Sequence, residues 1–213
     1  MARVKIDNVF KRYGALQVMH GVSVDIEDGE FVVLLGPTGA GKTTTLTTLS
    51  GERLPHAGKV DVTGEIGYLP QDPRDPDMDT LARDRILQAR GLDHLLDRMH
   101  DLEQTMATAT GEERDRAMDK YTKAEARLVA AGGYGAEAEA ARISSNLALP
   151  DRVLSQPLRN LSGGQRRRVE LARILFSGAD TLLLDEPTNH LDADSIVWLR
   201  SFLQSYSGGV LMI

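Results

Sequence analysis

The clearest chemistry in the sequence lies in the stretch GPTGAGKT, residues 36–43. Its spacing, G-x-x-x-x-G-K-T, is that of a phosphate-binding loop, and it follows an apolar run and opens a helical pattern, as the motif requires. Glycines let the backbone curl so that several N–H groups converge on phosphate oxygens, and the helix N-terminus adds positive potential. A glycine turn with a solvated lysine is the alternative, but chance occurrence is on the order of one in a thousand for ordinary residue usage.

In such a loop, Lys42 would reach the terminal phosphates of a nucleotide, and the hydroxyl of Thr43 would ligate Mg²⁺. The candidate nucleotide-binding residues of this stretch are Gly36, Gly39, Gly41, Lys42, Thr43 and Thr44. The sequence therefore predicts a site for ATP and Mg²⁺.

Two neighbouring acids follow a second apolar run, LLLDEP, residues 182–187. Asp185 would bind Mg²⁺ through water, and Glu186 could orient and polarise the attacking water. An Asp-Glu pair often only ends a strand. Together with the phosphate loop, the pair favours nucleotide hydrolysis.

A second phosphate-gripping pattern, LSGGQ, occupies residues 161–165. Small residues stand where a helix begins, so free N–H groups and the helix dipole could point at a phosphate. Why one chain needs two such stretches is not explained by either stretch alone.

The composition bounds the class of protein. The hydrophobic share of 41% and charged share of 26% are ordinary for a soluble globular protein. There is no cysteine, which excludes disulfides and thiolate metal sites and fits a reducing compartment.

No apolar run is long enough for a bilayer span, and the N-terminus does not have the pattern of a signal peptide, so we expect a cytoplasmic protein. The net charge of −6 argues against a nucleic-acid clamp, and no direct DNA binding is expected.

The surrounding pattern indicates the elements that position these residues. We expect a first strand near Val4 and Ile6, and then two strands joined by a hairpin-type turn at Asp28-Gly29. The second of these, residues 31–35, lacks alternation and is predicted to be a central strand buried on both faces. Residues 80–149 have helical spacing, and further helices are predicted over residues 166–176 and 193–206.

Four motifs in this order resemble the ATP-binding cassette (ABC) ATPase domain: GPTGAGKT, YLPQD, LSGGQRRRVELARIL and TLLLDEPTNHLD. The resemblance covers nearly the whole chain, and LSGGQ separates this family from other phosphate-loop proteins. It implies an α/β fold, a P-loop NTPase nucleotide-binding domain with an antiparallel β subdomain and an inserted helical subdomain. We expect residues 1–79 to form the β subdomain and phosphate-loop core, residues 80–160 the helical subdomain, and residues 161–213 the signature helix and the end of the core.

The resemblance also implies a partner. In the family two domains pair head to tail, and the LSGGQ of one contacts ATP held by the phosphate loop of the other. The second domain would be another copy or another cassette. This assigns Ser162, Gly163, Gly164 and Gln165 to the partner's nucleotide and explains the second stretch.

Further positions carry over one by one. Tyr13 matches the aromatic residue that stacks on adenine, although it could be a plain edge-strand aromatic. Gln71 matches the glutamine that touches Mg²⁺ and the attacking water, and Asp192 matches the loop that crosses to the partner site. The expected catalytic residues are Glu186, Gln71 and Lys42. The expected metal ligands are Thr43, Gln71 and Asp185.

The two ends of the chain point to different branches. Residues 1–45 resemble ATPase subunits of sugar importers, whereas residues 65–213 resemble the actinobacterial ABC-F branch, soluble ATPases that act on ribosomes. An engineered chimera and a divergent natural cassette are both compatible with this pattern. Three hypotheses follow: an ABC-F ATPase with a ribosomal partner, a transporter ATPase subunit with a membrane permease, and a module that binds ATP without turnover.

In the family, the strand that matches GGVLMI leads into a switch histidine that contacts the γ-phosphate. The sequence ends at Ile213, and none of its five histidines lies at the matching place. On this basis we expect weak hydrolysis and a last strand near the edge of its sheet.

Overall fold

The computed structural model describes residues 3–71, 77–130, 132–133 and 135–213. The chain folds into two compact units. The core unit contains residues 1–76 and 177–213, and the helical unit contains residues 77–176. The three-part division expected from the sequence stays a prediction.

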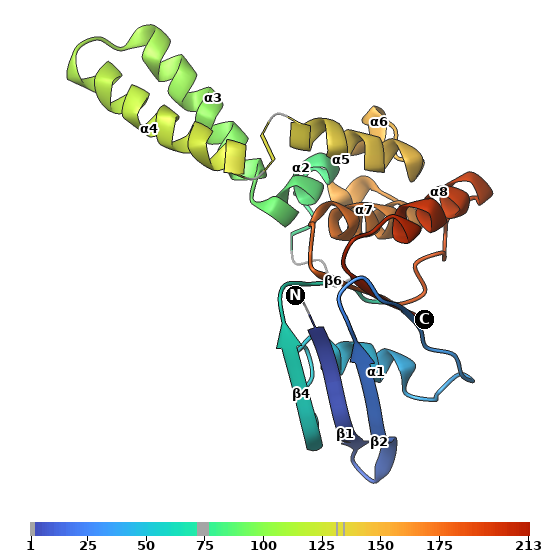
Figure 1. The fold of residues 1–213 in the computed structure, drawn as a ribbon. Helices are drawn as coiled ribbons and strands as arrows, with labels where there is room; N and C mark the ends of the chain where they lie inside the picture. The colour runs from blue at the N-terminus through green and yellow to red at the C-terminus, as the bar shows by residue number, and fades with distance from the viewer. Residues whose placement is uncertain (1–2, 72–76, 131, 134) are drawn as a thin grey trace. The chain divides into compact units, whose positions relative to one another are not determined.

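The core unit begins with a three-stranded antiparallel sheet in the order β2-β1-β4 (Figure 1). Its strands are β1 (Arg3–Tyr13), β2 (Leu16–Ile26) and β4 (Ala57–Thr63). Tyr13 pairs with Leu16, so β1 and β2 form a hairpin whose two-residue loop begins at Gly14. Residues of this sheet, such as Val4 and Met19, are fully buried together with Leu46 of the first helix.

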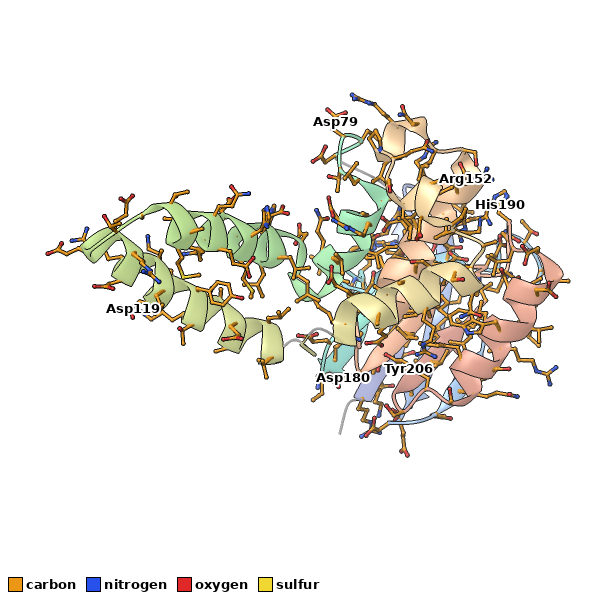
Figure 2. All side chains as sticks on the ribbon, turned by 90° about the horizontal axis from the view of Figure 1, so that it is seen from above. Asp79, Asp119, Arg152, Asp180, His190 and Tyr206 are labelled. Atoms are coloured by element: carbon orange, nitrogen blue, oxygen red, sulfur yellow. The ribbon has the colours of Figure 1, made fainter. Side chains whose placement is uncertain are left out.

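The second sheet of the core unit is parallel, in the order β3-β7-β6-β5. Its strands are β3 (Phe31–Val33), β5 (Ile66–Leu69), β6 (Thr181–Leu184) and β7 (Gly209–Met212). Two core-unit helices accompany it, α1 (Lys42–Leu49) and α8 (Ala193–Gln204). Asp180 and Tyr206, both labelled in Figure 2, connect the starts of β6 and β7. The Asp180 carbonyl accepts from Gly209 N–H at 3.0 Å, and the Tyr206 hydroxyl donates to the carbonyl of Ala179.

The expected hairpin at Asp28-Gly29 is wrong. The chain does turn there, since Glu30 N–H donates to the Glu27 carbonyl and Gly29 has a φ of 74°. However, β2 before the turn pairs with β1, and β3 after it pairs with β7. A turn sequence reports only the local reversal, and the partner of each strand is decided by residues far along the chain.

The expected positions of two strands are also wrong. Among the described residues β3 lies at an edge of the parallel sheet, and Phe31 and Val33 are 49% and 41% exposed. The last strand, β7, lies between β3 and β6 instead of near an edge. An apolar run shows that a strand has apolar neighbours, but strands with a nearly uniform apolar pattern do not reveal their order in the sheet.

The helical unit consists of helices and short 3₁₀ turns. They are α2 (Ala82–Leu87), η1 (Gln88–Arg90), α3 (Asp93–Thr108), α4 (Glu112–Ala130), α5 (Gly135–Asn146), α6 (Asp151–Leu154), η2 (Leu158–Asn160) and α7 (Gly163–Phe176). Helices α3 and α4 pack side by side as a hairpin (Figure 1). None of the helices in the described residues is long and apolar enough to cross a bilayer.

A buried ion-pair cluster joins α2 to α7. The Glu170 carboxylate is almost fully buried and accepts from Arg85 Nε at 2.6 Å and from Arg173 Nε at 2.9 Å. Arg90 similarly pairs with Glu139 and lies 4.0 Å from the centroid of the Phe176 ring. These contacts fix the helix that follows the LSGGQ stretch within its own unit.

Candidate nucleotide-binding site

The phosphate loop has the backbone that its glycines predict. Gly39 and Gly41 have φ angles of 82° and 80°, in the left-handed region that side chains disfavour. At Gly41 a Cβ atom would also lie 2.8 Å from the carbonyl oxygen of Val18, so β2 leaves no room for a side chain there. Residues 36–40 are exposed, which leaves the loop open to a ligand.

Lys42 folds back into this loop. Its Nζ donates to the carbonyl of Gly36 at 2.7 Å and to that of Pro37 at 3.0 Å. Lys42 is also the first residue of α1, whose first-turn N–H groups have no intrahelical acceptor. Thr43 and Thr44 follow in the same turn, with Thr43 exposed. A cation and several free donors therefore converge where a phosphate group would be held.

Tyr13 lies at the end of β1 and is 40% exposed. Arg53, in the loop after α1, donates to the Tyr13 hydroxyl, and its guanidinium carbon lies 5.2 Å from the ring centroid. Lys11 Nζ lies 5.8 Å from the same centroid. The sequence reasoning missed both cations. The approach of Arg53 depends on how β1 packs beside the end of α1, whereas Lys11 stands two residues before Tyr13 in the same strand, so its approach does not need that packing.

The structure brings together Gln71 and Glu186, two residues that are 115 positions apart. Gln71 Nε2 donates to Glu186 Oε2 at 3.3 Å. Gln71 follows β5 and Glu186 follows β6, and these two strands are parallel neighbours with Leu69 opposite Leu184. The carboxyl ends of parallel neighbours meet at one edge of a sheet, which places the two side chains beside each other.

Glu186 has an unusual backbone. Its φ is 47°, a left-handed conformation that costs a non-glycine residue roughly 1–2 kcal/mol. Asn189, three residues later, donates from Nδ2 to the same Oε2 atom at 2.7 Å. The sequence reasoning missed Asn189. The signal was available, since Asn is typical of turns and stands at the closing position of a four-residue turn that begins at Glu186.

Two other acidic candidates from the sequence, Asp185 and Asp192, lie on either side of that turn. Asp185 is 1% exposed, and its N–H donates to the Leu69 carbonyl, so the strand pairing continues one residue past β6. Asp192 is the N-cap of α8, and its Oδ1 accepts from Ser195 N–H at 2.8 Å. His190, labelled in Figure 2, stands between the turn and this cap with a φ of 67°.

The LSGGQ residues form the start of α7 in the helical unit. Ser162 N–H donates to Gln165 Oε1 at 2.9 Å, and Gln165 N–H donates to Ser162 Oγ at 3.2 Å. This reciprocal pair is a capping box, which satisfies two of the donors at a helix start. Gly163 and Gly164 occupy the first helical positions without side chains. Their N–H groups are the donors that the first turn presents to a ligand.

The donor chemistry fits a bound Mg²⁺. A threonine hydroxyl, a carboxylate and a side-chain amide are hard oxygen donors of the kind that Mg²⁺ takes in small number, with phosphate and water completing the shell. In the described part of the chain no three His, Cys, Asp or Glu residues gather into a metal site of their own.

Comparisons with known proteins give the family of the chain. The sequence pattern described as ABC transporter matches residues 19–189. The tylosin resistance ATP-binding protein TlrC of Streptomyces fradiae is 36% identical over 215 residues, which cover 100% of this chain and 39% of TlrC. The energy-dependent translational throttle protein EttA of Mycobacterium tuberculosis is 34% identical over 208 residues, which cover 96% of this chain and 36% of EttA. The chain thus spans less than two fifths of the length of these relatives.

The fold has close counterparts among solved structures. A structure described as the ATP binding subunit of an ABC transporter has a TM-score of 0.68 with 20% sequence identity, covering 98% of this chain and 78% of that one. This confirms the α/β cassette fold expected from the sequence. Because the family pattern spans most of the chain and includes both the phosphate loop and the Asp185-Glu186 pair, the chain belongs to the ABC family of ATP-binding domains.

Proposed function

We propose that this chain is a Mg²⁺-dependent ATPase cassette of ABC-F type, which binds ATP and then pairs head to tail with a second cassette. The observation that carries the proposal is the contact of Gln71 with Glu186, in the same unit as a phosphate loop that holds Lys42. The contact brings a carboxylate and an amide from the ends of two strands to one place. Together the two groups can hold a water molecule, and the carboxylate can act as its general base in ATP hydrolysis.

In the proposed reaction, Lys42 and the first-turn N–H groups of α1 bind the phosphates, and Tyr13 stacks on the adenine. Thr43, Asp185 and Gln71 would hold Mg²⁺, which when bound neutralises part of the phosphate charge. Glu186 orients a water molecule and accepts its proton as the oxygen attacks the γ-phosphorus. The bond from the γ-phosphorus to the bridging oxygen breaks, and ADP and inorganic phosphate leave.

The proposed second cassette supplies the other side of the nucleotide. Gly163 and Gly164 of the partner would donate their N–H groups to the γ-phosphate. Because glycine has no side chain, nothing at these two positions would block the phosphate from the helix start. Ser162 and Gln165 hold that helix start in shape through their capping box. Asp192 would carry the loop before α8 toward the same interface.

The proposed partner of the pair is the ribosome in the cytoplasm. One support is the relative named as a translational throttle protein, EttA. The other is the sequence TNHLD at residues 188–192, which resembles the ABC-F branch more than transporter cassettes. The test uses Glu186→Gln, which should keep ATP bound. We expect this variant to sediment with ribosomes in the presence of ATP and Mg²⁺ and to remain in the supernatant without ATP. Co-purification with a membrane permease instead would assign the chain to a transporter.

Hydrolysis is tested separately from binding. ATP affinity is measured by titration, and single-turnover phosphate release is measured beside it with the wild-type chain. We expect both to be present and hydrolysis to require Mg²⁺. Tight binding without any phosphate release would show that the chain is a nucleotide-binding module that does not turn over.

A further inference from the structure

We infer that Asn189 is a positioning residue for hydrolysis, which holds the Glu186 carboxylate in the orientation that the attacking water requires. The inference rests on the proposed function and adds a residue to it. Its basis is the hydrogen bond that Asn189 Nδ2 donates to Glu186 Oε2 at 2.7 Å.

Asn189 contacts Glu186 twice. Its main-chain N–H donates to the Glu186 carbonyl at 3.2 Å, which closes a turn, and its side-chain amide donates to the carboxylate. Glu186 has a φ of 47°, in a region that glutamate does not favour by itself. The backbone bond therefore supports the turn, and the side-chain bond sets the direction of the carboxylate within it.

Gln71 donates to the same oxygen, but from 3.3 Å and from another strand end. In the proposed reaction Gln71 also serves Mg²⁺ and water, so its bond to Glu186 must exchange during the cycle. Asn189 is only three residues from Glu186 and lies in the same turn, so its bond does not depend on that movement. This makes Asn189 the constant donor and Gln71 the exchangeable one.

The loop is anchored at its other end as well. Asp192 caps α8 through Ser195 N–H, and the Leu191 N–H donates to the Thr188 carbonyl at 3.2 Å. Asn189 thus sits in a loop held from both sides. A side chain on such a support can orient a neighbour with little loss of entropy, which is the condition for a positioning role.

The test separates the side-chain bond from the turn. Asn189→Asp keeps the size of the residue and suits the same turn, but it replaces the donor with a second carboxylate beside Glu186. Asn189→Ala removes the donor alone. We expect kcat to fall about 10- to 100-fold in Asn189→Ala and at least as much in Asn189→Asp, with the Kd for ATP unchanged in both. If Asn189 only shaped the turn, Asn189→Ala would lower the thermal stability but keep the wild-type kcat, and that result overturns the inference.

Thr188→Ala is the matched control. Thr188 is exposed in the same loop and contributes its main-chain carbonyl, which the substitution keeps. We expect wild-type kcat and thermal stability for this variant. An equal loss of kcat in Thr188→Ala would assign the effect to the loop as a whole and overturn the specific role of Asn189.

A second comparison shows whether Asn189 acts through Glu186. In a Glu186→Gln background, Asn189→Ala should cause no further fall in the single-turnover rate, because the carboxylate it positions is gone. If the wild-type protein hydrolyses ATP no faster than Glu186→Gln, the proposed function is wrong, and this inference fails with it. If the wild-type protein hydrolyses ATP faster than Glu186→Gln and the Asn189 variants have the wild-type rate, only the inference about Asn189 is wrong.

Discussion

The phosphate loop and the turn that holds Glu186 serve the same nucleotide in the proposed site, but they are built in different ways. The loop is self-contained. Lys42 bonds to carbonyls five and six residues before it, and the conformations of Gly39 and Gly41 are local. The Glu186 turn is assembled, because one of its donors, Gln71, is 115 residues away in sequence. The comparison teaches that a fixed spacing of residues in the sequence can encode a phosphate-binding loop. The surroundings of a carboxylate such as Glu186 depend instead on which strands are neighbours in the sheet.

The largest expected effect is on the assembled side. Glu186→Gln keeps the shape of the side chain but removes the base, so hydrolysis should fall by about 10²–10⁴-fold. ATP binding should persist, because the phosphate loop does not depend on Glu186. Phosphate release and ATP titration measure the two effects, and light scattering should show an ATP-dependent dimer with a longer lifetime. Hydrolysis at the wild-type rate would remove Glu186 from the reaction.

Removing the cation of the self-contained loop should act on binding. Lys42→Ala loses a charge-assisted contact worth about 1.5–3 kcal/mol, which corresponds to at least about a tenfold weaker ATP affinity. The loop backbone should persist, since its glycine conformations do not need the lysine. Direct titration gives the affinity, and urea denaturation checks that the fold is intact. An unchanged affinity would mean that Lys42 does not reach the phosphates.

A glycine substitution tests how closely the loop is fitted to β2. Gly41→Ala forces a side chain into a left-handed position and toward the Val18 carbonyl, which a Cβ would meet at 2.8 Å. We expect a loss of about 2 kcal/mol or more in the free energy of unfolding. Gly36→Ala is the control, because the nearest atom to its Cβ would be Ala40 Cβ at an ordinary 3.5 Å. Equal losses in urea denaturation would contradict the tight fit at Gly41.

The smallest expected effect concerns Tyr13. Arg53→Ala removes one of the two cations beside the ring and the donor to its hydroxyl, and it leaves Lys11 in place. An exposed contact of this type contributes about 0.5–1 kcal/mol, so ATP affinity should weaken roughly two- to fivefold. Arg53→Lys should recover part of it. A tighter ATP affinity in Arg53→Ala would show instead that the guanidinium occupies the place of the base.

Several elements follow directly from the sequence. Helix α1 begins at Lys42, after Gly41, and ends before Gly51, as the glycine pattern predicts. The helical stretch after residue 80 and the helix after Asp192 are also present. The nearly uniform apolar strand β6 lies in the interior of its sheet and is buried throughout. In each case the hydrophobic periodicity and the residues that end the helix or strand lie within one segment. The element can therefore be predicted without knowing its distant contacts.

The order of the parallel strands could not be read in this way. Strands β3 and β7 exchanged the positions expected for them, since β3 is at an edge of the described sheet and β7 is inside it. Both are short apolar runs, and nothing in Phe31–Val33 or Gly209–Met212 distinguishes an inner from an outer place. Strand order comes from crossover connections and packing over many residues, which are long-range properties of the chain.

The same division holds for the site. The sequence by itself determined the phosphate loop, because left-handed glycines, a lysine and a helix start at fixed spacing leave one local structure that binds phosphate. Only the tertiary structure decided which groups surround Glu186 and Tyr13. Gln71 reaches Glu186 because β5 and β6 are neighbours, and Arg53 reaches Tyr13 because the end of α1 lies beside β1. Asn189 is intermediate, since its spacing from Glu186 was visible, but its donation to Oε2 depends on the left-handed backbone that the folded turn imposes.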